Sequence, residues 1–175
     1  MAELHVVGEI LGASGFPSPK LSCKWSLIAG EGWKVIEGVT SGQTHVDLPT
    51  DDRYTIWSHP IDIHYGTKTL VGWPKLQLQV YHQDEYGRNE LYGYGFIHLP
   101  TTPGTHELEC PTWRPLGSTS DQLWSYFLGA TPQLKKLDHI HSPMDRYRLN
   151  TISMGKVHVE VTVIVRNFDA YGVAL

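Results

Sequence analysis

The sequence predicts an all-β fold, an antiparallel β-sandwich of about eight strands with one short inserted helix. Apolar and polar residues alternate with the period of a strand through most of the chain. Gly or Pro separates nearly all of the alternating segments. The clearest segment carries valine at every second position of Val157–Val165, which is typical of an antiparallel strand with one buried and one wet face.

The alternating segments predict the strands in chain order. Pro60 divides two of them, because proline interrupts the hydrogen-bond ladder of a central strand. The candidates are Glu3–Leu11, Leu21–Leu27, Trp33–Glu37, Gln43–Leu48, Tyr54–Ser58, Ile61–Tyr65, Lys75–Val80, Leu91–Leu99, Thr105–Cys110, Arg146–Ile152 and Val157–Val165.

One segment, Ser118–Gly129, departs from the strand pattern. Leu123, Tyr126 and Phe127 have the i, i+3, i+4 spacing of one helical face. A serine before the segment suits the helix start, and the glycine suits its end. We therefore predict one short helix between two strands.

The composition is that of one ordinary globular domain, which we assign to residues 1–175. Apolar residues make up 41% and charged residues 18% of the chain, with a net charge of −4. Both signs are interspersed, so no broad attraction to nucleic acid is expected. Two cysteines permit one bridge at most, and the N-terminus lacks the basic and apolar regions of a signal peptide. We interpret the protein as cytoplasmic with free thiols.

No pattern in the sequence indicates an enzyme or a cofactor. Nucleophile-elbow and phosphate-loop motifs are absent from the sequence. Cys23 alternates with apolar neighbours as a core thiol would. His59 and His64 fall on opposite faces of a predicted strand. His139 and His141 are the best local candidates for metal ligands, but nothing nearby completes a set of four, and a polar loop is the other interpretation.

Several motifs resemble a known family. Leu76–Pro100 resembles the strand, acidic loop and strand of a C2 domain. The sequence is more similar still to the B9 family, a divergent C2-like group, over essentially all of its length. The motifs that carry this resemblance are Trp57–Asp62, Gly72–Pro74, Gly93–Gly95, Pro111–Gly117 and Arg166–Gly172.

The resemblance implies a C2-like sandwich and a function without catalysis. It implies a scaffold subunit of the B9 and tectonic-like complex, needed for cilium assembly and for the diffusion barrier at the ciliary base. The implied partners are B9 domain-containing protein 1, the Meckel syndrome type 1 protein and other members of the tectonic-like complex. The implied location is the transition zone and basal body.

The residues at the C2 calcium loop do not make a good calcium site. Calcium takes six to eight oxygen ligands, several of them anionic. His82 and Asp84 stand at the first two ligand positions, and the later acidic position falls near Glu90. The first loop, Ala13–Lys20, holds no acid. We expect no bound metal and interpret the second loop as a solvated hairpin turn.

Loop and tail residues are the candidates for a partner interface. Aromatic and arginine side chains are favoured interface anchors, so Trp113 and Arg114 either contact a partner or hold their own loop on the domain. The turn that carries Thr101 and Thr102 is a further candidate. Phe168 and Tyr171 either cover the edge of the sandwich or bind a partner.

A calcium-independent lipid-binding module is the alternative function. C2 domains contact membranes through basic faces or apolar loop tips. Phe16 and Tyr86 are candidate tips, and Lys135 and Lys136 are a candidate basic pair. Because each basic residue near an anionic surface contributes about 1 kcal/mol, two alone give weak attachment.

Overall fold

The computed structural model describes residues 1–50, 54–116, 134 and 150–169, and within them the chain forms nine strands. They run antiparallel to their sheet neighbours. The strands are β1 (Ala2–Ser14), β2 (Leu21–Ile28), β3 (Trp33–Gly38), β4 (Ser41–Gln43), β5 (Tyr54–Thr67), β6 (Lys75–Gln83), β7 (Asn89–His98), β8 (Gly104–Pro115) and β9 (Thr151–Arg166).

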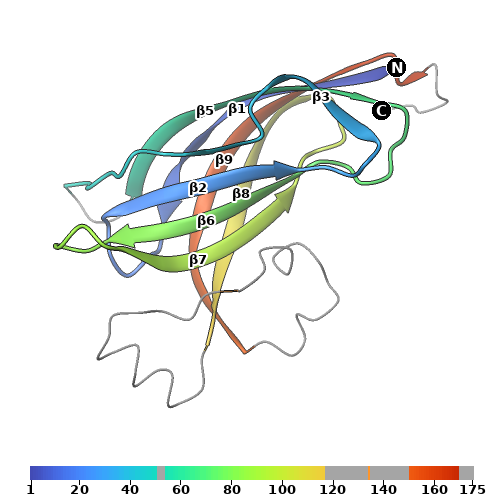
Figure 1. Ribbon diagram of the computed structural model, residues 1–175. Helices are drawn as coiled ribbons and strands as arrows, with labels where there is room; N and C mark the ends of the chain where they lie inside the picture. Colours follow the sequence, from blue (N-terminus) through green and yellow to red (C-terminus); the bar gives the residue numbers. More distant parts are fainter. Residues whose placement is uncertain (51–53, 117–133, 135–149, 170–175) are drawn as a thin grey trace.

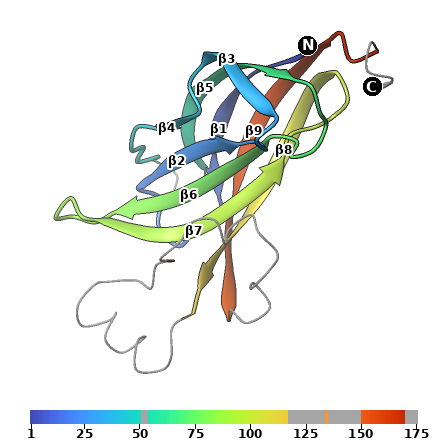
Figure 2. The ribbon, with the colours of Figure 1, turned by 45° about the vertical axis from the view of Figure 1, so that its right-hand side comes forward.

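The strands form one curled sheet in the order β3-β5-β1-β9-β8-β7-β6-β2-β4. The pairing between β7 and β8 is a single residue pair, Tyr94 with Trp113. At this seam the sheet folds over, so that β2, β6 and β7 lie in front of β5, β1, β9 and β8 (Figures 1 and 2). The predicted sandwich is therefore confirmed, in the form of a folded sheet.

The core lies between the two layers and follows the alternation seen in the sequence. One layer contributes the valines of β9, and the other contributes the leucines of β6. The Trp57 indole Nε1 donates to the Leu21 carbonyl oxygen at 3.2 Å, which joins the layers by a buried hydrogen bond. The largest fully buried side chains are Trp25, Leu4, Ile10, Leu21, Ile61, Ile63, Leu76, Leu78, Leu91, Val6 and Val80.

The division of one strand at Pro60 was wrong. β5 runs without a break from Tyr54 to Thr67. β3 pairs with β5 only from Ile63 onward, so Pro60 has a paired neighbour on one side only and needs no amide for a second. Before it, Ser58 has φ 42°, at an irregularity of the β1–β5 pairing where the register shifts.

Two other strand predictions need correction. Gln43–Leu48 is not a strand: β4 ends at Gln43, and only an isolated bridge joins Asp47 to Leu21. β8 does not end at Cys110 but continues through Pro111 to Pro115. Here β7 pairs with β8 only at Trp113, so Pro111 needs no amide for a ladder on that side.

The remaining predictions of secondary structure fall on other parts of the chain. The helix at Ser118–Gly129 and most of the strand at Arg146–Ile152 lie outside the described residues. Thr151 and Ile152 begin β9, which runs unbroken to Arg166, so the predicted division before Val157 was wrong. Within the described residues, no helix has the length and apolar character needed to cross a bilayer.

Candidate interaction surface

The turn between β6 and β7 is built around the carboxylate of Asp84. Asp84 Oδ1 accepts from the backbone amides of Tyr86 at 2.9 Å and Arg88 at 2.8 Å. Asp84 Oδ2 accepts from Arg88 Nε at 2.7 Å. Gly87 takes φ 78° to close the turn, and its amide donates to the Asp84 carbonyl at 3.2 Å. Local hydrogen bonds of this kind hold the turn in one shape.

Two basic side chains contact Asp84, Arg88 at its carboxylate and Lys20 at its backbone carbonyl. Desolvation raises the pKa of the Asp84 carboxyl, but the hydrogen bonds and charge of Arg88, with the Tyr86 amide, outweigh it and hold that pKa below its usual value. Lys20 Nζ donates to the Asp84 carbonyl oxygen at 3.4 Å. The carboxylate that a calcium ion would need is therefore already paired.

The other two residues of the degenerate calcium loop do not join Asp84 in a ligand set. His82 stacks on Tyr92, with ring centroids 4.8 Å apart, and its Nδ1 lies 3.0 Å from the Lys20 carbonyl oxygen. Glu90 is the cross-strand neighbour of His82. Among the described residues, no group of three or more His, Cys, Asp or Glu is arranged to hold a metal ion.

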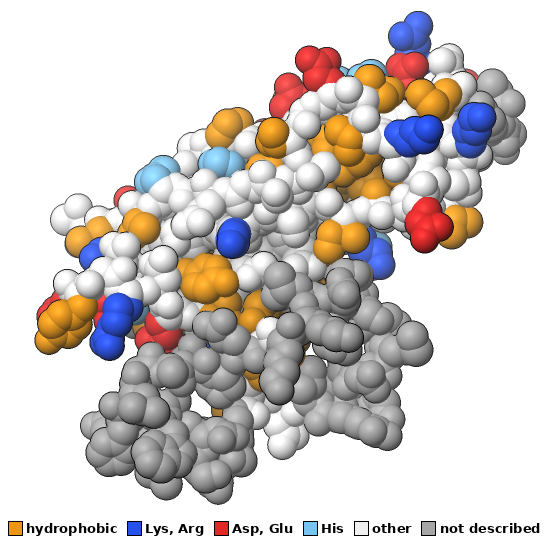
Figure 3. Space-filling model, viewed as in Figure 1, with side chains coloured by type: hydrophobic (Ala, Val, Ile, Leu, Met, Phe, Trp, Pro, Cys, Tyr) orange, Lys and Arg blue, Asp and Glu red, His pale blue; other side chains and the backbone are white. Residues whose placement is uncertain are grey.

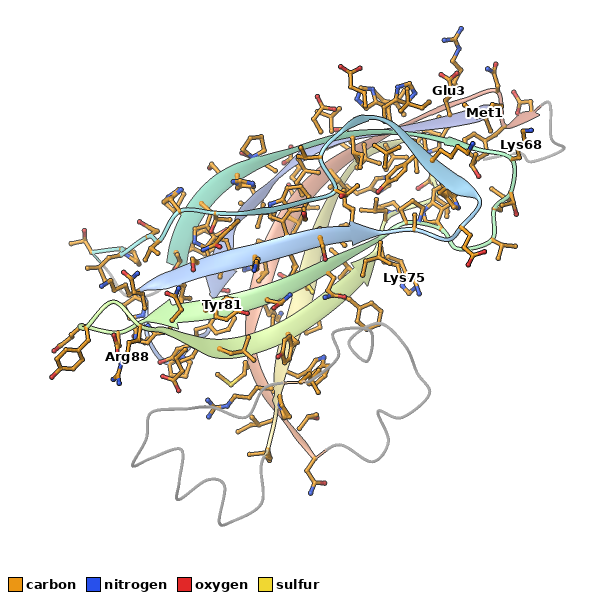
Figure 4. The ribbon with its side chains drawn as sticks, in the orientation of Figure 1. Met1, Glu3, Lys68, Lys75, Tyr81 and Arg88 are labelled. Atoms are coloured by element: carbon orange, nitrogen blue, oxygen red, sulfur yellow. The ribbon has the colours of Figure 1, made fainter. Side chains whose placement is uncertain are left out.

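Tyr86 is the exposed end of this turn. Its side chain is 83% exposed, and the Arg88 guanidinium lies over its ring at 5.5 Å from the centroid. Figure 3 shows apolar, basic and acidic side chains at the hairpin end, and Figure 4 shows Arg88 there, projecting from the body of the domain. The tip thus presents an aromatic ring stacked with a guanidinium.

The other lipid candidates are placed differently. Phe16 is half-buried against the core, and its ring lies over Gly155, where a Cβ atom would strike it. It therefore acts in packing in this conformation. Lys135 and Lys136 lie outside the described residues.

Trp113 lies at the seam of the folded sheet. Its ring packs on Tyr94 with centroids 5.8 Å apart, and Tyr94 accepts at its hydroxyl from the Leu134 amide at 3.1 Å. Trp113 and Arg114 are both half-buried. The structure thus gives this corner contacts on its own domain while leaving part of both side chains accessible.

Thr101 and Thr102 are exposed in the turn between β7 and β8. The Thr102 carbonyl oxygen lies 2.9 Å from His106 Nε2, which fastens the turn to the start of β8. Both threonines remain accessible to a partner.

Phe168 is buried. Asn167 takes φ 62°, which turns the chain after β9 and directs Phe168 into the core. Phe168 is 4% exposed, and its ring centroid lies 6.2 Å from that of Trp73. The structure therefore matches the edge-covering interpretation of Phe168. Tyr171 lies outside the described residues.

A network on the outer face of β1 and β5 was not predicted from the sequence. His5 Nε2 lies 2.8 Å from Asp62 Oδ1, and the ring of His5 stacks on His64 at 5.3 Å. His64 in turn lies 3.5 Å from a carboxylate oxygen of Glu3. His5 and His64 each fall on the polar face of an alternating strand, and this pattern was the signal that could have predicted the network. His59 instead contacts Trp25, on the face opposite to His64 as predicted.

Three glutamates lie directly opposite one another on that same outer face. Glu9 of β1 pairs in register with Glu160 of β9, and Glu160 pairs with Glu107 of β8. Like charges in such positions repel. Two residues further along β8, Glu109 accepts from Lys156 Nζ at 2.7 Å and is compensated.

The two cysteines are core residues rather than reactive groups. Both are buried and unbridged. Burial raises the pKa of the Cys110 thiol to about 12 and the pKa of the Cys23 thiol further still. Neither is present as a thiolate near neutral pH.

Comparisons with known proteins match the whole domain. A family model described as "Ciliary basal body-associated, B9 protein" matches residues 4–164. The chain belongs to the B9 family. B9 domain-containing protein 2 of Xenopus laevis is 59% identical to this chain over 99% of it and 98% of the relative. The Homo sapiens protein of that name is 55% identical over 99% of each.

More distant proteins also match along the length of the chain. B9 domain-containing protein 1 of Xenopus laevis is 28% identical over 97% of this chain and 87% of the relative. Among solved structures, the C2A domain of plant Extended Synaptotagmin 1 aligns over 95% of this chain and 96% of that chain, with a TM-score of 0.46 and 15% identity. The B9 assignment rests on the family match and on the identities with B9 domain-containing protein 2.

Proposed function

We propose that this chain is a non-enzymatic scaffold subunit of the B9 and tectonic-like complex at the ciliary transition zone. Its partners in this proposal are B9 domain-containing protein 1 and the Meckel syndrome type 1 protein. The single observation that carries the proposal is the whole-length similarity to the B9 proteins, whose family is described as associated with the ciliary basal body. Similarity to a second kind of B9 protein supports assembly between paralogues.

The chemistry of the described side chains supports a binding role. Cys23 and Cys110 are buried thiols in the core. Asp84, the first acid of the degenerate loop, is paired with Arg88. These groups serve packing and turn formation, which fits a domain that acts through its surface.

Complex formation is tested by size-exclusion chromatography of the full chain mixed with each B9 paralogue separately. The proposal predicts that the chain elutes earlier with at least one paralogue than it does alone. A mixture with an unrelated C2 domain is the control for unspecific association. Separate elution from both paralogues would refute the scaffold role.

Exposure of Tyr86 also favours a second candidate, a calcium-independent lipid-binding module. An aromatic loop tip can insert at a membrane interface, where one end of the ring is apolar and the other wet. Co-sedimentation with vesicles, with and without anionic lipid, separates the two functions. Sedimentation of the isolated chain at physiological salt, without paralogue binding, would favour the membrane role.

A further inference from the structure

We propose that the turn Asp84–Arg88, here called the hairpin tip, anchors a partner protein, with Tyr86 entering an apolar pocket and Arg88 facing a carboxylate or carbonyl group of that partner. This inference rests on the proposed function and assigns a surface to it. It moves Tyr86 from a lipid contact to a protein contact.

The residue types at the hairpin tip and their exposure suit a protein interface. Tyrosine and arginine are enriched among the residues that dominate binding energy at protein interfaces, while leucine and valine are under-represented. Tyr86 is 83% exposed, and Arg88 Nε is held by Asp84 at 2.7 Å with the side chain 67% exposed. The terminal nitrogens of the guanidinium can therefore still reach a partner.

The hairpin tip is held in one shape by its own hydrogen bonds. The Asp84 carboxylate accepts three hydrogen bonds from the turn, and Lys20 adds a fourth contact through the Asp84 carbonyl. The Arg88 guanidinium stacks on the Tyr86 ring. A rigid anchor loses less conformational entropy on binding than a flexible one. The tip is therefore ordered before any partner arrives.

The charges at the tip favour a protein over an anionic membrane. Lys20 and Arg88 are the basic side chains in contact with the turn, whereas Asp84, Glu85 and Glu90 are acidic. Lys20 and Arg88 balance the two acids of the tip, Asp84 and Glu85, and Glu90 in β7 adds one more acid, so the attraction of about 1 kcal/mol per basic residue to an anionic leaflet is cancelled. A protein pocket suits both side chains, with an apolar wall for Tyr86 and a hydrogen-bond acceptor for Arg88.

The hairpin tip does not need a calcium ion to hold its shape. Arg88 contributes a positive charge at the Asp84 carboxylate, where a calcium ion would bring its own, and Lys20 holds the Asp84 carbonyl. Because these charges belong to the chain, the tip keeps its shape without the ion. Binding through it is consequently insensitive to calcium and to chelators.

The test is the affinity of the full chain for B9 domain-containing protein 1, measured by isothermal titration calorimetry. Tyr86→Ala is expected to weaken binding by about tenfold or more, the range of an interface hot spot. Tyr86→Phe keeps the ring and is expected to bind within about threefold of the wild type. Val71→Ala is the matched control, since Val71 is 79% exposed at the other end of β6.

Three outcomes separate the possibilities. If the wild type binds and Tyr86→Ala binds with the same affinity, the proposed role of the hairpin tip is wrong and the scaffold role still stands. A wild type that binds neither paralogue would overturn the scaffold role itself. Loss of vesicle sedimentation on Tyr86→Ala would assign the tip to lipid and also overturn the inference. Because Tyr86 is exposed, the melting temperatures of all variants should agree with the wild type.

Discussion

Arg88 donates from Nε to Asp84 Oδ2 across 2.7 Å, inside the turn whose sequence resembles a degenerate calcium loop. The same carboxylate accepts two backbone amides of its own turn. A calcium ion at this carboxylate would meet the positive charge of Arg88 beside it. The Asp84 carboxylate is thus engaged by its own turn, and these bonds account for the shape of the turn.

The first prediction is that calcium does not stabilise the protein. A site with Kd of about 10 μM would add about 2.7 kcal/mol of stability at 1 mM calcium, because the ligand binds only the folded state. For a domain of this size that corresponds to roughly 5–10 °C in Tm. We expect a change below about 1 °C in a thermal melt, measured against EDTA. A shift of several degrees would show a site that the loop geometry does not reveal.

The second prediction concerns pH and Asp84. The pKa of this carboxyl is lower in the folded protein than in the unfolded chain, so its charge stabilises the fold above the usual Asp pKa of about 3.9. That contribution is lost as pH falls through the lower folded-state pKa. Asp84→Asn should therefore melt below the wild type at pH 7, and the gap should close toward pH 3. A gap that stays constant across this range would contradict the charge pairing.

The third prediction is that removing a charge from the acidic row raises stability. Glu160 lies directly between Glu9 and Glu107 on neighbouring strands. Glu160→Gln should stabilise the fold by roughly 0.5–1 kcal/mol at low salt, and less at high salt because screening weakens the repulsion.

Glu109→Gln is the matched control for Glu160→Gln. The hydrogen bond and charge of Lys156 hold the pKa of Glu109 below its usual value, so this carboxylate is stabilising rather than repelled. Its removal should lower Tm. Equal effects of both substitutions in a denaturant titration would be inconsistent with the register.

The fourth prediction separates the cost of backbone strain from the cost of steric overpacking when a glycine is replaced by alanine. Gly72 has φ 76°, and a Cβ there would lie 2.5 Å from the Gly30 Cα. Gly87 has φ 78° with open space around it. Gly87→Ala should cost roughly 1–2 kcal/mol for backbone strain alone. Gly72→Ala should cost roughly 1–3 kcal/mol more for overpacking. Urea titrations that gave the two substitutions the same cost would argue against the close Gly30–Gly72 contact.

The fifth prediction is that both thiols are unreactive in the native state. Cys23 and Cys110 are buried and their pKa values are raised. Labelling with a thiol reagent at pH 8 should follow the unfolding rate, and both should react promptly in denaturant. Rapid reaction of either thiol in the folded protein would place it at the surface.

The alternation in the sequence was enough to predict the core, because inward valines of β9 and leucines of β6 repeat with period two. It did not predict how β5 passes Pro60, since that depends on where β3 stops pairing. A proline is harmless where a strand has one paired neighbour, and this is a property of the assembled sheet. The end of β8 at Pro115 was missed for the same reason.

For the candidate site, the residue types predicted that the loop is a poor calcium site. They did not predict that Arg88 and Lys20 would contact Asp84. Arg88 follows Asp84 by four positions, and only the closed turn brings Nε to the carboxylate. Lys20 comes from a different loop, 64 positions away from Asp84, so spacing gave no sign of it. Burial of Phe168 was one of two interpretations of the sequence, but the left-handed turn at Asn167 that produces it was not predicted.

The most direct test of the scaffold account is a calorimetric titration of the full chain into B9 domain-containing protein 1, in EDTA and again in 1 mM calcium. The account predicts saturable binding with the same Kd in both buffers. No binding in either buffer to this paralogue or to the Meckel syndrome type 1 protein would contradict it. So would binding that appears only when calcium is present.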